Sequence, residues 1–440
     1  MKNLFLTNRF FWLLGAFIAL FGLSFAVPWL FPVVQALFVL ALAIIGLDIW
    51  ILFNKNVQVA AGRELPKLFN LGDSNPVKLH LYNNSNLKLN IIIIDELPVQ
   101  FQIRDFSERT TLNPAEKRTI QYELRPTERG EYAFGAINLY LSSIINLVQR
   151  RIRIETDAKV PVYPSILQMK QLELRAFNRT AQFAGIKKMR RIGHSYEFEQ
   201  IKNYVRGDDY RSINWKASSR HGELMVNQYE DERAQQVYSV IDKSRSMRLP
   251  FNGLSLMDYA INTSLAISNI ALQKYDRAGL ITFSDKIGST VKADNHPTQL
   301  NKILQALYKE RERHLEANYE LLYHAVRKLV NRRSLLLLYT NFESMYALER
   351  VLPLLRKINT FHLLVVIFFE NTEIRDFAHG KVETLEGIYH QTVAQKFLAE
   401  KSQMVQVLNQ YGIQSVLTAP EDLSINTINK YLELKSRGLI

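Results

Sequence analysis

The residues best suited to chemistry form a short, oxygen-rich turn. An apolar stretch from Gln236 to Ile241 is followed at once by Asp242, Ser244 and Ser246 in a DxSxS pattern. One carboxylate and two hydroxyls on a single loop offer hard oxygen ligands to one side of a Mg²⁺ ion. The same residue types also cap helix starts. The pattern therefore supports two interpretations, weak Mg²⁺ binding and a purely structural turn.

A second polar stretch, residues 193–232, lies just before this turn. Its charged and aromatic residues follow neither the helix nor the strand period, which indicates specific polar contacts. It contains the ion-pair-rich turn Arg206-Gly207-Asp208-Asp209-Tyr210-Arg211 and the run Ile213-Asn214-Trp215-Lys216-Ala217. We expect the second run to place Trp215 against the domain that follows.

Two functions are open for this polar stretch. Asp208 and Asp209, together with His194, could act as the acid/base or metal centre of a hydrolase. Nearby cations should instead keep both aspartates ionised and paired; these are Arg206, Arg211, Lys216 and Arg220. The cations favour a rigid recognition surface.

Both segments resemble one bacterial family, domain of unknown function 58 (DUF58). The matching residues run from Tyr196-Glu197-Phe198 through GDD, INWKASSR and YEDE to the DxSxS strand, and the resemblance extends roughly from Val57 to the C-terminus. It implies a membrane-anchored protein with a von Willebrand factor A-like domain and a MoxR-type AAA+ ATPase as partner. It implies no agreed activity. The signature residues then become candidates for partner binding: Tyr196, Glu197, Arg206, Gly207, Asp208, Asp209, Arg211, Asn214, Trp215, Lys216 and Arg220.

The resemblance also implies a metal-ion-dependent adhesion site. In von Willebrand A-like domains, two further loops complete that site with a Thr and an Asp. By position these are Asn318 and Asn341 in this chain. An amide in place of the carboxylate removes a full charge, so any Mg²⁺ should be bound weakly by Asp242, Ser244, Ser246, Asn318 and Asn341.

The first 55 residues predict a two-helix membrane anchor. Phe10 to Phe53 carries one ionisable residue, Asp48, and prolines break it only near position 30, which gives spans at Phe10–Ala26 and Pro32–Phe53. The turn between the spans lacks Lys and Arg. Cations flank both outer ends, namely Lys2, Arg9, Lys55 and Arg63. The positive-inside rule therefore predicts a multi-pass protein with its soluble domains in the cytoplasm, and the resemblance implies that the membrane is the bacterial inner membrane. A cleaved signal peptide ending near Ser24-Phe25-Ala26 is the alternative.

Residues 56–163 predict an immunoglobulin-like antiparallel β-sandwich. Polar and apolar residues alternate in short runs such as Val77–Tyr82 and Lys117–Leu124, which turn residues separate. The resemblance implies an Asp-Pro-Phe-Gly-like turn further on, where this chain has Ser142-Ser143-Ile144-Ile145-Asn146. A basic linker, residues 164–192, follows. It predicts either a solvated face or attraction to anionic lipid, with nucleic acid a weaker third alternative.

Residues 193–440 hold the signature and then alternate strands with helices. Strands are expected at 236–241, 277–283, 334–339, 362–369 and 414–418, and helices at 258–275, 299–307, 319–330, 345–358 and 393–411. Nearly continuous apolar strands such as LLLLY predict a parallel sheet covered on both faces, in a doubly wound α/β domain. Asp242 and Asn341 then fall at the carboxyl ends of strands, where ligands bind in this class.

Composition limits the remaining functions. The chain has 440 residues, 47% hydrophobic content, a net charge of +13 and no cysteine, which excludes disulfides and thiolate chemistry. The sequence contains no GxxxxGK[ST], HExxH, GxGxxG or GxSxG motif. The hypothesis is a non-enzymatic membrane adaptor whose partners are an AAA+ ATPase and the lipid bilayer, with no nucleic acid. The alternatives are the hydrolase and a lipid- or nucleic-acid-binding linker.

Overall fold

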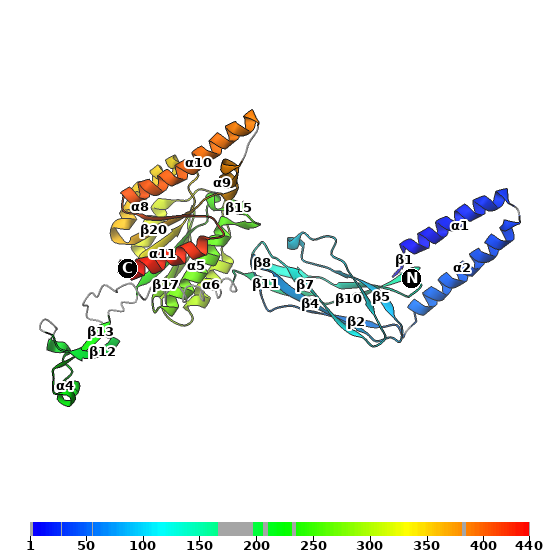
Figure 1. Cartoon of the computed structure of the whole chain (residues 1–440), viewed down its shortest axis with the longest axis horizontal. Coiled ribbons are helices and arrows are strands. Elements are labelled where there is room, and N and C mark those ends of the chain that lie inside the picture. The colour runs from blue at the N-terminus through cyan, green and yellow to red at the C-terminus, as the bar shows by residue number, and fades with distance from the viewer. Residues whose placement is uncertain are drawn as a thin grey trace. The chain divides into compact units, whose positions relative to one another are not determined.

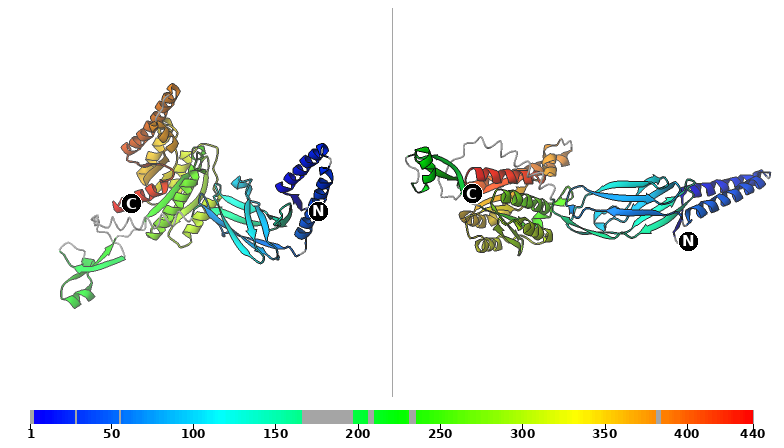
Figure 2. Two further views of the ribbon diagram at one scale, coloured as in Figure 1. Left: turned by 45° about the vertical axis from the view of Figure 1, so that its right-hand side comes forward. Right: turned by 90° about the horizontal axis from the view of Figure 1, so that it is seen from below.

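The computed structural model describes residues 3–27, 29–54, 56–165, 197–205, 210–230, 235–380 and 384–439 (Figures 1 and 2). The chain divides into two compact units, Met1–Tyr163 and Pro164–Ile440. The first unit contains two apolar helices and a set of β-sheets. The second contains a small signature module and an α/β domain.

Two apolar helices open the first unit. Helix α1 spans Asn8–Ala26 and α2 spans Leu30–Leu52, which confirms the predicted pair with slightly earlier starts. Both are long and apolar enough to cross a membrane. Edge-to-face contacts of Phe17 and Phe21 with Phe38 pack the two helices together.

The β region of this unit is built from three sheets. Their strand orders are β1-β10-β9-β5-β6, β2-β4-β7 and β3-β11-β8, and among the described strands of this unit only the β3–β11 pair is parallel. Strict alternation of buried and exposed residues in β4 matches the predicted half-buried strand. The strands are β1 Leu4–Leu6, β2 Val59–Glu64, β3 Phe69–Asn70, β4 Asn75–Asn83, β5 Leu89–Asp95, β6 Glu108–Leu112, β7 Lys117–Leu124, β8 Gly130–Phe134, β9 Ile137–Ser142, β10 Val148–Ile154 and β11 Ala158–Tyr163.

A buried ion pair joins two of these sheets. The Arg63 guanidinium on β2 donates to the Asp95 carboxylate on β5, with Nε to Oδ2 at 3.0 Å, and both side chains are almost fully buried. The Tyr122 hydroxyl on β7 donates to the same carboxylate at 2.5 Å. Arg63 is therefore a core residue.

Over residues 235–380 and 384–439, the α/β domain has a six-stranded sheet in the order β18-β17-β14-β19-β20-β21, in which only β18 is antiparallel to its neighbour. Its strands are β14 Gln236–Asp242, β17 Arg277–Phe283, β18 Ile287–Asp294, β19 Leu335–Tyr339, β20 Leu363–Phe369 and β21 Gln414–Thr418. Its helices are α5 Leu256–Gln273, α6 Gln299–Lys309, α7 Tyr319–Leu329, α8 Met345–Phe361, α9 Thr372–His379, α10 Leu385–Gln410 and α11 Leu423–Ser436. The short strands β15 (Pro250–Phe251) and β16 (Leu254–Ser255) form a hairpin before α5.

Helices cover both faces of this sheet, as the continuous apolar strands predict. On β19, Leu335 and Leu337 face one core with residues of α5, α6 and α11, whereas Leu336 and Leu338 face a second core with residues of α7, α8 and α10 (Figure 1). All five predicted strands are confirmed. The structure adds β18, α9 and α11, and begins α10 at Leu385 instead of Val393.

The signature folds as a small module of its own. Strand β12 (Glu197–Asn203) pairs antiparallel with β13 (Met225–Glu230), and a short 3₁₀ turn and helix α4 (Trp215–His221) lie between them. The Asn214 side chain caps α4 by accepting from the Ala217 N–H at 3.0 Å. Gly222, at φ 74°, ends the helix in the left-handed conformation that favours glycine.

Candidate functional site

The DxSxS turn lies where the order of the α/β sheet reverses. In chain order, the sheet runs outward from β14 to β17 and β18 on one side, and from β14 to β19, β20 and β21 on the other. The turn follows β14, and Thr340 and Asn341 follow the adjacent β19. In doubly wound sheets ligands bind at this switch point, outside the carboxyl ends of the strands. The fold therefore places the predicted residues at its usual binding position.

The Asp242 carboxylate is buried and held by two hydrogen bonds. Its Oδ1 accepts from the Ser244 N–H and its Oδ2 from the Thr340 hydroxyl, each at 2.8 Å. The Tyr319 hydroxyl lies 2.7 Å from that of Thr340. Burial raises the pKa of Asp242, against the lowering effect of these hydrogen bonds. No cation contacts this carboxylate among the described residues.

The other two oxygen donors of the turn are hydroxyls. Ser244 Oγ and Ser246 Oγ lie 3.1 Å apart. The turn is fixed by its backbone, because the Arg245 N–H donates to the Leu315 carbonyl at 3.1 Å and the Arg313 N–H donates to the Lys243 carbonyl at 2.8 Å. The turn is thus preformed.

The Asn318 amide is used as a helix cap. Its Oδ1 accepts from the N–H groups of Glu320 and Leu321 at 3.0 and 3.1 Å, and so opens α7. The Asn318 N–H donates to the Ser284 carbonyl at 2.8 Å. This side chain therefore ties the second loop to its helix.

Asn341 contacts both the DxSxS turn and a buried lysine. Its Nδ2 donates to the Ser246 carbonyl at 3.3 Å, and its Oδ1 accepts from Lys401 Nζ at 3.0 Å. The same ammonium donates to the Phe342 carbonyl. Burial lowers the pKa of Lys401 to about 8, although the Glu343 carboxylate opposes this. Lys401 thus places a cation beside Asn341, the position at which the expected metal-ion-dependent adhesion site has its Asp.

These donors fit a tightly held Mg²⁺ poorly. The predicted set supplies one carboxylate and two hydroxyls, while the amide oxygens of Asn318 and Asn341 already accept hydrogen bonds within the protein. Within the described ranges, no three His, Cys, Asp or Glu residues cluster so that they could hold a metal ion. Mg²⁺ prefers near-octahedral oxygen sites and gives up its water reluctantly. The geometry favours a turn that functions through its shape and hydrogen bonds.

A buried ion pair supports the turn from below. Lys243 Nζ donates to Glu310 Oε2 at 2.7 Å, and Glu310 Oε1 accepts from the Thr282 hydroxyl and the Ser289 N–H at 2.8 Å each. Burial would raise the pKa of Glu310, but these hydrogen bonds outweigh it and hold the pKa below its usual value. A Cβ added at Gly288 would meet Lys243 Nζ and Thr282 Oγ1. The glycine therefore leaves the space that this pair occupies.

Charged and apolar side chains surround the mouth of the turn. Arg350 pairs with Glu316 at 3.0 Å, and Arg245 pairs with the same carboxylate at 3.3 Å. Leu315, which precedes Glu316, and Tyr346 in the first turn of α8 are also exposed. Exposed ion pairs contribute little to stability, so these pairs do little to hold the fold.

The signature module divides its predicted residues into two groups. Asn214 holds the fold through its cap, whereas Arg211, Lys216 and Arg220 are exposed. Trp215 is 71% exposed, so the prediction that it packs against the α/β domain was wrong. The backbone of Glu197 belongs to β12. The remaining predicted residues lie outside the described part of the chain: Tyr196, Arg206, Gly207, Asp208, Asp209 and, for the hydrolase, His194.

Three contributors to the site were not predicted. Thr340 stands directly before Asn341, so its position beside the turn could have been read from the strand end. Lys401 occupies the apolar stripe of α10 that also contains Ala394, Met404 and Leu408, and a lysine on such a stripe is a usable signal. Glu310 has no comparable local signal.

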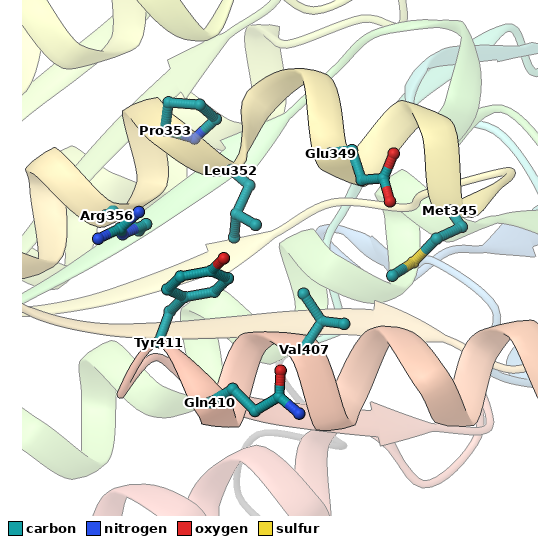
Figure 3. A pocket seen from close by; sticks show the side chains of 8 residues that line it. All are labelled: Met345, Glu349, Leu352, Pro353, Arg356, Val407, Gln410 and Tyr411. Atoms are coloured by element: carbon teal, nitrogen blue, oxygen red, sulfur yellow. The ribbon is translucent and has the colours of Figure 1, made fainter.

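A separate shallow pocket of about 400 Å³ lies between α8 and α10 (Figure 3). Leu352, Val407 and Tyr411 form its apolar part, and Arg356 stacks on the Tyr411 ring at 4.4 Å. None of the predicted site residues lines it. The pocket is therefore distinct from the DxSxS turn.

Taken together, the sheet order and the turn define a doubly wound α/β domain with a preformed polar turn at its switch point. Residues 200–383 match the model of the family described as "Protein of unknown function DUF58". This match confirms the resemblance to the DUF58 family that the signature predicted.

Known proteins give further matches. "Uncharacterized protein YeaD" of Bacillus subtilis (strain 168) is 25% identical over 128 residues, which is 29% of this chain and 32% of the relative. The chain thus matches about a third of that relative's length. Two solved structures each cover about a quarter of the chain. They are the CARDB domain of PF1109 from Pyrococcus furiosus (13% identity, 24% of this chain, 90% of that one, TM-score 0.19) and the PapD-like domain 7 of human CEP192 (11% identity, 26% of this chain, 89% of that one, TM-score 0.20).

Proposed function

We propose that this protein is a non-enzymatic membrane adaptor whose von Willebrand A-like α/β domain and signature module present a protein-binding surface. The observation that carries the proposal is the exposure of large aromatic residues within the family signature. Trp215 and Tyr210 are 71% and 68% exposed, and the exposed cation Arg211 lies against the Tyr210 ring. Trp, Tyr and Arg are the residue types that dominate binding energy at protein interfaces.

The DxSxS turn supplies the second part of this surface. The Asp242 carboxylate accepts a hydrogen bond from Thr340, and the Asn341 amide oxygen accepts one from Lys401. In the proposal these bonds keep the turn in shape without a divalent ion. The exposed rim around it combines ion pairs with Leu315 and Tyr346, a mixture common at interfaces. The resemblance to DUF58 proteins makes a MoxR-type AAA+ ATPase the proposed partner. ATP hydrolysis would then belong to that partner.

The apolar helices α1 and α2 support a membrane location. In the proposal both cross the bacterial inner membrane, and the α/β domain and signature module face the cytoplasm.

Co-purification in detergent tests this function. The full-length chain would be captured with and without ATP and Mg²⁺, and the recovery of an AAA+ ATPase would be measured for the wild type, Trp215→Ala and Asp242→Ala. Tyr275→Ala is the matched control, because Tyr275 is equally exposed but lies at the opposite, amino end of the sheet, just before β17.

We expect Trp215→Ala to reduce capture at least tenfold, as loss of an interface hot spot does, and Tyr275→Ala to leave it unchanged. A further loss with Asp242→Ala would extend the surface to the DxSxS turn. Failure of the wild type to capture an ATPase under any nucleotide condition would refute the proposed partner.

A further inference from the structure

The loop between β9 and β10, residues 143–147, is held at the ends of both apolar helices. Asp48 of α2 accepts from the Ser143 hydroxyl at 2.5 Å and from the N–H groups of Leu147 and Val148 at 3.1 Å each. The Thr7 hydroxyl, directly before α1, donates to the carbonyls of Asn146 and Leu147 at 2.7 and 3.0 Å. The loop is therefore fixed relative to the helix pair.

The position of Asp48 sets the depth of this loop. Helix α2 has 23 residues and ends at Leu52, so it is about 34 Å long, compared with about 30 Å for the hydrocarbon core of a bilayer. If α2 spans that core symmetrically, Asp48 lies about 4 Å inside its boundary. The Asp48 side chain is fully buried, and the acceptor bonds from the loop explain how a carboxylate is tolerated at that level.

The residues between these contacts point apolar side chains outward. Ile144 is 72% exposed and Ile145 is 37% exposed, although the segment is bonded to Asp48 on both sides. Phe5 and Leu6 of β1, the strand that pairs with β10 next to the loop, are also exposed. The segment 143–148 contains no charged residue. Such a surface is poorly suited to water and well suited to lipid.

Cations lie where lipid headgroups would be. Arg9 is exposed in the first turn of α1. The Arg150 guanidinium donates to the Leu52 carbonyl at 3.0 Å at the end of α2, and stacks on the Phe53 ring. Apolar side chains bordered by arginine are typical of segments that enter the membrane interface.

We propose that the loop 143–147 inserts Ile144 and Ile145 into the boundary of the lipid bilayer, so that the β region is seated directly on the membrane. This inference rests on the proposed membrane-spanning role of α1 and α2. The bilayer is the occupant because the loop is continuous, through Asp48 and Thr7, with the ends of the two helices.

Spin labels measure the depth directly, because the chain has no native cysteine. Three single-cysteine variants of the full-length protein, Ile144→Cys, Val99→Cys and Leu40→Cys, would be labelled with a nitroxide and reconstituted into phosphatidylcholine/phosphatidylglycerol vesicles. Collision rates with oxygen and with a water-soluble nickel chelate would then be compared. Far-UV circular dichroism would verify that each labelled variant is folded.

The other two positions serve as references. Leu40 is exposed at the middle of α2 and reports on the span itself. Val99 is 89% exposed and lies beyond the end of β5 at which Asp95 pairs with Ile137. The loop 143–147 begins at the opposite end of β5, where Asn90 pairs with Ser142. Five residue steps along a strand place these ends about 17 Å apart.

The expected result is an oxygen-to-nickel collision ratio at Ile144 at least threefold above that at Val99, with the highest ratio at Leu40. A Val99-like ratio at Ile144 beside a membrane-like ratio at Leu40 would overturn the inference alone. A water-like ratio at Leu40 would overturn the membrane span and, with it, the inference.

Discussion

Replacing Lys401 by Met should change how stability depends on pH. Burial lowers the pKa of this lysine from 10.5 to about 8. Below pH 8 the folded and unfolded chains both carry the proton, and the folded state bears the full cost of a buried ammonium. Between pH 8 and 10.5 the folded chain has lost that proton and the unfolded chain has kept it, so stability rises with pH.

The size of the effect follows from the two pKa values. At about 1.4 kcal/mol per pKa unit, the wild type should gain about 3 kcal/mol between pH 7.5 and 10.5 relative to Lys401→Met. Other titrating groups cancel in this difference, because the two proteins share them. Lys396→Met is the matched control, since Lys396 is exposed on the same helix and should produce no such change.

Urea unfolding of the detergent-solubilised full chain provides the assay. A fluorophore on Lys357→Cys, an exposed position on α8, would report on the α/β domain in all three proteins. A wild-type curve that runs parallel to that of Lys401→Met over this pH range would show that Lys401 is hydrated, and would refute its role in holding the loop at Asn341. A difference that falls with pH would mean that the ammonium is paired with a carboxylate.

Three further predictions use the same structure. Gly288→Ala should cost about 3 kcal/mol in the urea assay, because the new Cβ displaces Lys243 from its buried pair with Glu310; an unchanged midpoint would contradict this packing. Asp242→Asn should leave stability at pH 7 equal or higher, since burial raises the pKa of the carboxyl and the Thr340 hydroxyl can turn to accept from an amide; a clear loss would instead indicate a bound cation. Asp48→Ala should leave the buried N–H groups of Leu147 and Val148 without an acceptor, which costs about 1–3 kcal/mol for each group. Hydrogen-exchange protection at the start of β10 should therefore fall at least tenfold. Unchanged protection would show that Asp48 does not hold the loop.

Elements with strong apolar patterns could be predicted from the sequence. Strands β19 and β20 are buried on both faces, so their side chains form continuous apolar runs that identify a covered sheet. The missed strand β18 is an antiparallel edge strand of mixed burial, and its sequence IGSTVKAD lacks both signals. The first turns of α10 were missed because Leu385 and Tyr389 are exposed and give no amphipathic pattern.

The site was predicted where its residues are local and missed where contacts are distant. Asp242, Ser244 and Ser246 form one contiguous pattern, whereas Lys401 reaches Asn341 from 60 positions away. The prediction for Trp215 was wrong because an indole is usually buried. The sequence alone does not distinguish a tryptophan of the core from one that is exposed on a binding surface.

The pairing of β1 with β10 also has a consequence for biosynthesis. Leu6 and Val148, which pair in these strands, are 142 positions apart, so the ribosome adds the second partner roughly 7–30 s after the first at ordinary elongation rates. The two apolar helices are completed in the first third of that interval, while the strand in front of them still has no partner. In a chain that is inserted during synthesis, the helices would enter the bilayer first, and the β region would close afterwards onto an N-terminus already held at the membrane surface.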